Sequence, residues 1–123
     1  THETYAMDVL KFLKQTDQKY DIVVVDPPAY AKSQKARHNA IQGYKRLNIA
    51  AFKKVKKGGL MFTFSCSQVV DRALFSHTIL AAALESGRKI RVLHHLSQPA
   101  DHPMNIFHPE GNYLKGLVLS VED

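Results

Sequence analysis

The chain has 123 residues, of which 45% are hydrophobic and 23% charged, and its net charge is +6. This length suits one domain at most, and this composition excludes a disordered chain. No apolar run approaches the roughly 20 residues of a membrane-spanning helix. The lone Cys66 excludes an internal disulfide and a metal cage of several cysteines, and the histidines lack metal-site spacing. The start at Thr1 carries no signal segment, so we expect a cytoplasmic protein, cut from a longer one.

The hydrophobic pattern predicts helices and strands in alternation. Helices are expected over residues 7–16 with Asp8 as the cap, over 41–57 with Gly58-Gly59 as the stop, and from Asp71 to Gly87. Buried strands are expected at 20–25 and 60–65, and further strands at 89–96 and 113–121. Residues 29–40 are polar, basic and without a period, which indicates a loop.

This order of elements predicts an α/β domain in which a parallel sheet carries helices on both faces. No helix separates the last two strands, so they should pair as an antiparallel hairpin, an ending typical of class I methyltransferases. The chain lacks a GxGxG-type turn, which in a complete domain holds the cofactor. We therefore interpret residues 1–123 as the C-terminal half of a doubly wound, Rossmann-like class I methyltransferase domain.

Two short motifs follow the two buried strands. Asp26-Pro27-Pro28-Ala29-Tyr30 ends the first, and Ser65-Cys66-Ser67 ends the second, so neighbouring strands would let Asp26 and Cys66 face one ligand. The prolines hold the carboxylate and carbonyls forward to accept hydrogen bonds from a base, on which Tyr30 could stack. The alternatives are a plain strand-ending turn and a cysteine that is core filler.

The basic residues are concentrated in one stretch. No acidic residue lies between Asp26 and Asp71, and this stretch holds nine of the seventeen basic residues. It includes Lys32 and Lys35 beside the first motif and a run from Lys53 to Lys57. A solvated helix face would explain such a run, but its nearness in sequence to the motifs favours contact with nucleic-acid phosphates.

Several motifs in order resemble one known family. They are Asp26-Pro27-Pro28, Phe64-Ser65-Cys66-Ser67, Gln98-Pro99-Ala100-Asp101-His102-Pro103 and Pro109-Glu110-Gly111-Asn112-Tyr113-Leu114-Lys115-Gly116. From about Asp8 to Val121 the chain resembles the bacterial RlmI-type family of 23S ribosomal RNA cytosine-5 methyltransferases, whose members carry an N-terminal PUA RNA-binding domain. Neither that domain nor the glycine-rich cofactor half is within the chain.

The resemblance implies S-adenosylmethionine as the methyl donor and RNA, 23S rRNA in particular, as the partner. By it, Asp8 matches the acid that binds the cofactor's adenine, Asp26 and Pro27 match the motif between donor and base, and Cys66 matches the nucleophile. Pro28, Tyr30, Lys32 and Lys35 are the expected substrate contacts. No metal and no membrane are expected, and the oligomeric state is open, a homodimer included.

The chemistry explains why a thiol is expected. A thiolate that adds to carbon 6 of cytosine makes carbon 5 nucleophilic, and Asp26 at N3 would ease the addition. Basic residues near Cys66 would favour its thiolate form. Two other functions stay open: methylation of an exocyclic amine of adenine or guanine, which needs no thiol, and a non-catalytic RNA-binding module. The isolated chain is expected to be inactive.

Overall fold

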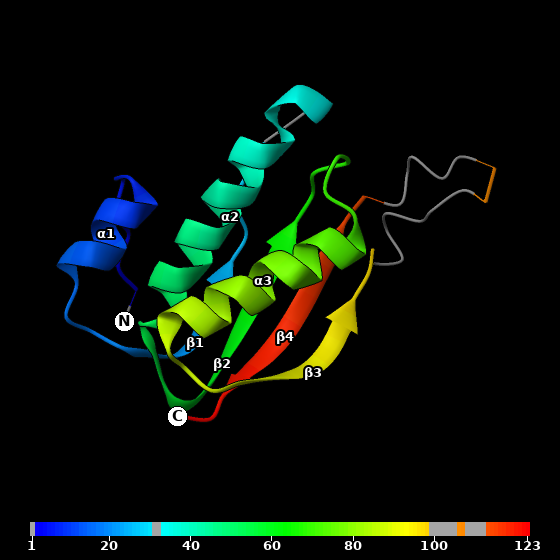
Figure 1. Cartoon of the computed structure of the whole chain (residues 1–123). Coiled ribbons are helices and arrows are strands. Elements are labelled where there is room, and N and C mark those ends of the chain that lie inside the picture. The colour runs from blue at the N-terminus through cyan, green and yellow to red at the C-terminus, as the bar shows by residue number, and fades with distance from the viewer. Residues whose placement is uncertain (1, 31–32, 99–105, 108–112) are drawn as a thin grey trace.

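The computed structural model describes residues 2–30, 33–98, 106–107 and 113–123. In this part of the chain, three helices lie on one face of a four-stranded sheet (Figure 1). The elements are α1 (Val9–Gln15), β1 (Tyr20–Val25), the short 3-10 helix η1 (Gln34–Ala36), α2 (Arg37–Phe52), β2 (Val55–Ser65), α3 (Arg72–Ser86), β3 (Ile90–Leu96) and β4 (Lys115–Val121). Within the described residues, no helix is long and apolar enough to cross a membrane.

The sheet has the strand order β1-β2-β4-β3. β1 pairs parallel with β2, whereas β4 pairs antiparallel with both β2 and β3. β3 therefore runs parallel to β2, and β4 is the one strand of the described sheet with the opposite direction. The predicted antiparallel pairing of the last two strands is confirmed, and the structure adds that β4 inserts between β2 and β3.

The helices do not cover both faces of the sheet in this chain, and that prediction was wrong for the described part. α2 links β1 to β2, and α3 links β2 to β3, so the chain crosses the sheet in one direction. Right-handed crossovers that advance in one direction place their helices on the same face. On the opposite face, Ile22 and Val24 of β1 are 59% and 63% exposed.

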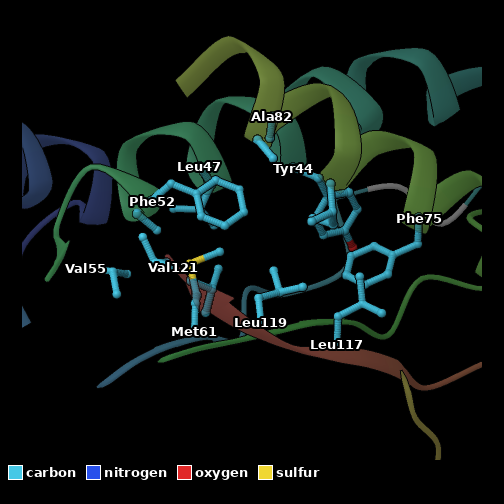
Figure 2. Close-up of a cluster of buried hydrophobic side chains, with 14 of the residues drawn as sticks. Tyr44, Leu47, Phe52, Val55, Met61, Phe75, Ala82, Leu117, Leu119 and Val121 are labelled. Atoms are coloured by element: carbon cyan, nitrogen blue, oxygen red, sulfur yellow. The ribbon is translucent and has the colours of Figure 1, made fainter. Parts of the chain in front are cut away.

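The hydrophobic core fills the space between the helices and the sheet (Figure 2). Alternate residues of β2 and β4 point toward the helices because successive side chains of a strand face opposite sides. The largest fully buried side chains of this core are Tyr44, Phe52, Phe75, Met61 and Leu119. Burial of a side chain of this kind stabilises the fold by about 1.5–3 kcal/mol.

The ends of α1 and α3 follow local signals that the sequence contains. The carboxylate of Asp8 accepts a hydrogen bond from the backbone N–H of Lys11, and Asp71 accepts one from that of Leu74. Gly87 ends α3 with φ 73°, a left-handed conformation that costs glycine little. The predicted cap at Asp8 and the predicted stop at Gly87 are confirmed, and the structure adds Asp71 as the cap of the helix predicted to start near it.

The predicted limits of α2 were wrong at both ends. The helix begins at Arg37 and is preceded by η1, so residues 34–40 are not a loop. Its first turn is exposed and polar, and such a turn gives no apolar period to detect. The helix ends at Phe52, five residues before the predicted end at Lys57.

Gly58 and Gly59 lie inside β2 rather than at the end of a helix. The β1–β2 register shifts between the pairs Tyr20–Val55 and Ile22–Leu60. Gly58 takes φ 83°, and a Cβ on Gly59 would lie 2.7 Å from the backbone oxygen of Asp21. The two glycines therefore form an irregular step in the strand: the positive φ of Gly58 would strain any other residue, and a side chain at Gly59 would not fit.

Candidate functional site

The two predicted motifs meet at the carboxyl edge of the sheet. Val25 of β1 pairs with Thr63 of β2, so Asp26 leaves its strand one residue later and Cys66 leaves its strand three residues later. Neighbouring strands lie about 4.8 Å apart. The Asp26 side chain is exposed and Cys66 is partly buried. The structure thus places Asp26 and Cys66 at the same edge of the sheet, just after two neighbouring strands.

Tyr30, which follows the Asp26 motif, packs against α2. Its ring lies 4.8 Å from that of Tyr44 in an edge-on arrangement, and it also covers the open side of Gly43. This packing leaves 42% of Tyr30 exposed. Burial of the rest raises the pKa of Tyr30 above its usual value. The ring is therefore held by the helix with one part free to meet a ligand.

Tyr44 connects this motif to the end of β2, a role that sequence analysis did not find. Its phenol oxygen accepts a hydrogen bond from Ser65 Oγ at 3.1 Å, and its ring contacts that of Tyr30. Burial raises the pKa of Tyr44, so the phenol stays neutral. In the sequence Tyr44 is one of several residues at helical spacing, and nothing distinguishes it from apolar core.

A second polar link ties α2 to β2 one turn further along. Thr63 Oγ1 donates to Asn48 Oδ1 at 2.6 Å, and Asn48 Nδ2 donates to the Tyr44 carbonyl at 2.7 Å. Both side chains are fully buried. Every buried side-chain nitrogen and oxygen of the described residues has a hydrogen-bond partner. A satisfied polar network of this kind fixes the helix relative to the strand.

Both backbone polar groups of Ser67, the residue after Cys66, form hydrogen bonds. Its N–H donates to Ser65 Oγ at 3.3 Å, and its carbonyl accepts from Lys115 Nζ at 2.7 Å. Lys115 is only 5% exposed, and its Nζ also donates to the Tyr113 carbonyl. Burial lowers the pKa of Lys115 to about 8, and the nearby Arg72 adds to that effect.

Two hollows border the site, and Cys66 lines neither. The larger has a volume of about 800 Å³ and runs along the open edge of β1, between α1 and the turn from Asp26 to Tyr30. The smaller, of about 350 Å³, lies between the start of α3 and Lys115. The larger groove has apolar walls with Asp26, Pro27 and Pro28 at one end, which suits part of a cofactor, but the chain has no glycine-rich turn for the rest.

The remaining predicted residues are placed as follows. Asp8 caps α1 and lies near enough to Tyr30 to raise the pKa of its phenol, so it belongs to the same end of the fold. Pro27 is buried, while Pro28 and Lys35 are exposed. Lys32 lies outside the described residues, as do residues 99–105 and 108–112 of the family motifs. In the part that is described, no three His, Cys, Asp or Glu side chains are grouped to hold a metal.

The lysine run from Lys53 to Lys57 does not lie beside the site, in contrast to its nearness in sequence. α2 runs back from the carboxyl edge, so these lysines lie at the amino end of β2, roughly 25 Å along the strand from Ser65. There Lys54 donates to the Thr16 carbonyl, and Lys56 pairs with Asp21 at 3.6 Å. Lys35 in η1 and Arg37 at the start of α2 precede the end of that helix from which Tyr44 reaches the site.

Comparison with known proteins places these features in context. The chain is similar to proteins named ribosomal RNA large subunit methyltransferase I: 42% identity over 115 residues in Aeromonas salmonicida, 43% over 117 in Vibrio vulnificus and 41% over 124 in Shewanella amazonensis. The matches cover 91–98% of the chain but only 29–31% of these relatives, so the chain spans about a third of their length. The predicted resemblance is confirmed. No family model matches the chain.

Solved structures confirm the fold. A SAM-dependent methyltransferase from Streptococcus mutans matches with a TM-score of 0.73 and 21% identity, over 94% of this chain and 30% of that one. A methyltransferase in complex with SAH matches with a TM-score of 0.70 and 23% identity, over the same shares. The chain therefore has the mixed α/β sheet of a methyltransferase fold, corresponding to a part of those structures.

Proposed function

We propose that this chain is the part of an S-adenosylmethionine-dependent RNA methyltransferase that acts on the target base, carbon 5 of a cytosine in 23S rRNA. The observation that carries the proposal is the juxtaposition of Asp26 and Cys66 at the ends of the paired strands β1 and β2. Two findings support it: the similarity to ribosomal RNA large subunit methyltransferases over nearly the whole chain, and the methyltransferase fold.

Each residue of the site has a chemical task in this proposal. The Cys66 thiolate adds to carbon 6 of the cytosine, and Asp26 binds or protonates N3, which draws electrons toward the ring nitrogen. S-adenosylmethionine, when bound, supplies the methyl group. Asp8 and Pro27 contact this cofactor. After methylation the carbon 5 proton leaves to a base, and the Sγ–carbon 6 bond breaks to return the thiol.

The substrate contacts are proposed on the exposed side of the same edge. Pro28 and the free part of Tyr30 border the flipped base, because stacking on an aromatic ring holds an unpaired base. Lys32, Lys35 and Arg37 contact the neighbouring phosphates. The lysines at the far end of β2 contact phosphates only where the RNA extends that far.

The decisive experiment replaces the thiol in an enzyme of the relatives' full length that contains this chain. Cys66→Ser should abolish methylation, since a hydroxyl is far less nucleophilic than a thiolate, and leave cofactor affinity unchanged. The unmodified enzyme should form a covalent adduct with RNA that carries 5-fluorocytosine, because fluorine cannot leave as a proton does. Asp26→Asn should retain RNA binding and slow the chemical step.

The second candidate function is methylation of an exocyclic amine of adenine or guanine. The exposed carboxylate of Asp26, followed by two prolines and the half-exposed Tyr30, favours it, since this arrangement can bind an amino group on a stacked base. This chemistry needs no thiol. A Cys66→Ser enzyme that methylates at a near-normal rate therefore refutes the cytosine-5 proposal and supports the amino-group reaction.

The RNA contacts are tested by charge reversal at the two ends of α2. Lys35→Glu with Arg37→Glu should weaken RNA binding for all sequences alike and reduce the salt dependence, because phosphate contacts release counterions. Lys53→Glu with Lys56→Glu is the matched pair at the opposite end. An equal loss from both pairs would show a general charge effect and contradict contacts confined to the site.

A further inference from the structure

Lys115 joins the two strands that end beside Cys66. It is the first residue of β4, and its register partner on β2 is Ser65, the residue before Cys66. Its side chain extends further, to the carbonyl of Ser67 at 2.7 Å. Lys115 thus contacts the chain on both sides of the cysteine, through its backbone before it and through its ammonium group after it.

The backbone of Ser67 forms a second hydrogen bond, with Ser65, in addition to the one with Lys115. Ser65 Oγ accepts the N–H of Ser67 and donates to the phenol of Tyr44. Ser65, Ser67 and Lys115 are all at least 95% buried, whereas Cys66 between them is partly exposed. Cys66 therefore lies on a short segment that is fixed at both ends, and it is itself only partly buried.

Burial of an ammonium group costs free energy unless hydrogen-bond acceptors or an opposite charge compensate for the lost water. Lys115 has two carbonyl acceptors but, among the described contacts, no ion pair with a carboxylate. The charged or titratable groups around it are Arg72 and Asp71 at the start of α3 and the Cys66 thiol at the end of β2. Tyr44 of α2 also interacts electrostatically with that thiol, and Asp26 follows the neighbouring strand β1.

We propose that Lys115 is a positioning residue for Cys66: its ammonium group holds the Ser65–Ser67 segment in place and sets a positive charge beside the thiol. The proposal rests on the proposed role of Cys66 as the nucleophile. The ammonium group and the Cys66 side chain interact electrostatically, and the hydrogen bond to the Ser67 carbonyl limits the movement of the attacking sulfur. Neither effect requires Lys115 to touch the substrate.

The experiment measures the alkylation rate of Cys66 by iodoacetamide, followed by mass spectrometry on the 123-residue chain. Cys66 is its single cysteine, so the rate reports one thiol. Lys115→Met should slow alkylation at pH 7 by about 3- to 10-fold, since it removes both the positive charge near the sulfur and the hydrogen bond that holds the segment. Lys115→Arg keeps the charge, and the 350 Å³ hollow beside Lys115 gives the larger group room. It should restore the rate to within about twofold.

The pH profile separates a charge effect from a purely structural one. The ratio of the wild-type to the Lys115→Met rate should be largest at pH 7, where Lys115 is charged, and approach one above pH 9, where Lys115 with its pKa of about 8 is neutral. A structural effect alone would give a ratio that does not change with pH. Lys115→Gln provides the same neutral comparison if the methionine variant is unfolded.

The matched control is Arg88→Met. Arg88 is also a part-buried cation that donates to backbone oxygens, those of Phe52 at 2.6 Å, Val55 at 2.9 Å and Asp123 at 2.6 Å, but it lies at the opposite end of the sheet. Its loss should leave the alkylation rate unchanged. Equal or faster alkylation of both neutral Lys115 variants overturns the proposal. Because the assay involves no methyl transfer, it stays informative if the Cys66→Ser enzyme proves active.

Discussion

Replacement of Tyr44 by Phe tests whether the polar link between α2 and the end of β2 stabilises the fold. The phenylalanine ring keeps the edge-on contacts with Tyr30 and Phe75, whose ring centres lie 4.8 and 6.3 Å away. The variant removes only the oxygen that accepts from Ser65 Oγ, and Ser65 is 1% exposed. A buried hydroxyl left without its partner costs roughly 1–3 kcal/mol. The free energy of unfolding should fall by this amount.

The assay is urea unfolding followed by circular dichroism, in which the midpoint and slope give the free energy of unfolding. Each kcal/mol should lower the melting temperature by roughly 3–5 °C for a domain of this size. Tyr20→Phe is the matched control, because its hydroxyl donates to Gln18 in an exposed bond of 3.2 Å and should cost less than about 0.5 kcal/mol. Equal losses in the two variants would refute the reasoning.

Three further predictions concern the same region and its ligand. Gly116→Ala should destabilise the fold by about 1–3 kcal/mol in urea unfolding, because its Cβ would lie 2.5 Å from the Phe64 ring; Phe64→Ala should relieve most of this penalty. The folded pKa of Lys115 is about 8 against an ordinary 10.5, so between these values the unfolded chain binds more protons there and stability rises with pH. The free energy of unfolding, relative to Lys115→Met, should therefore increase from pH 7.5 to 9.5, and a constant difference would contradict the lowered pKa. Finally, calorimetry should find binding of S-adenosylmethionine to this chain weaker than micromolar, since the chain lacks the glycine-rich turn; micromolar binding would overturn that view.

The sequence by itself determined those features that depend on neighbouring residues. The β-branched run of β1, the caps at Asp8 and Asp71, and the stop at Gly87 are local signals, and the structure has each of them. The meeting of Asp26 and Cys66 could also be predicted, because parallel strands joined by a helix end at the same edge of a sheet. Much of the candidate site follows from that rule alone.

Only the tertiary structure decided the features that depend on long-range pairing. The insertion of β4 between β2 and β3 buries Lys115 beside Cys66, and no local pattern encodes which strands become neighbours. The direction of α2 carries the lysine run away from the site, although the run is near the motifs in sequence. From the sequence alone, Tyr44 would be assigned to the apolar core. In the structure, Ser65 of β2 donates a hydrogen bond to its phenol oxygen. In each case the arrangement involves residues far apart in the chain, so it arises only when the sheet has formed.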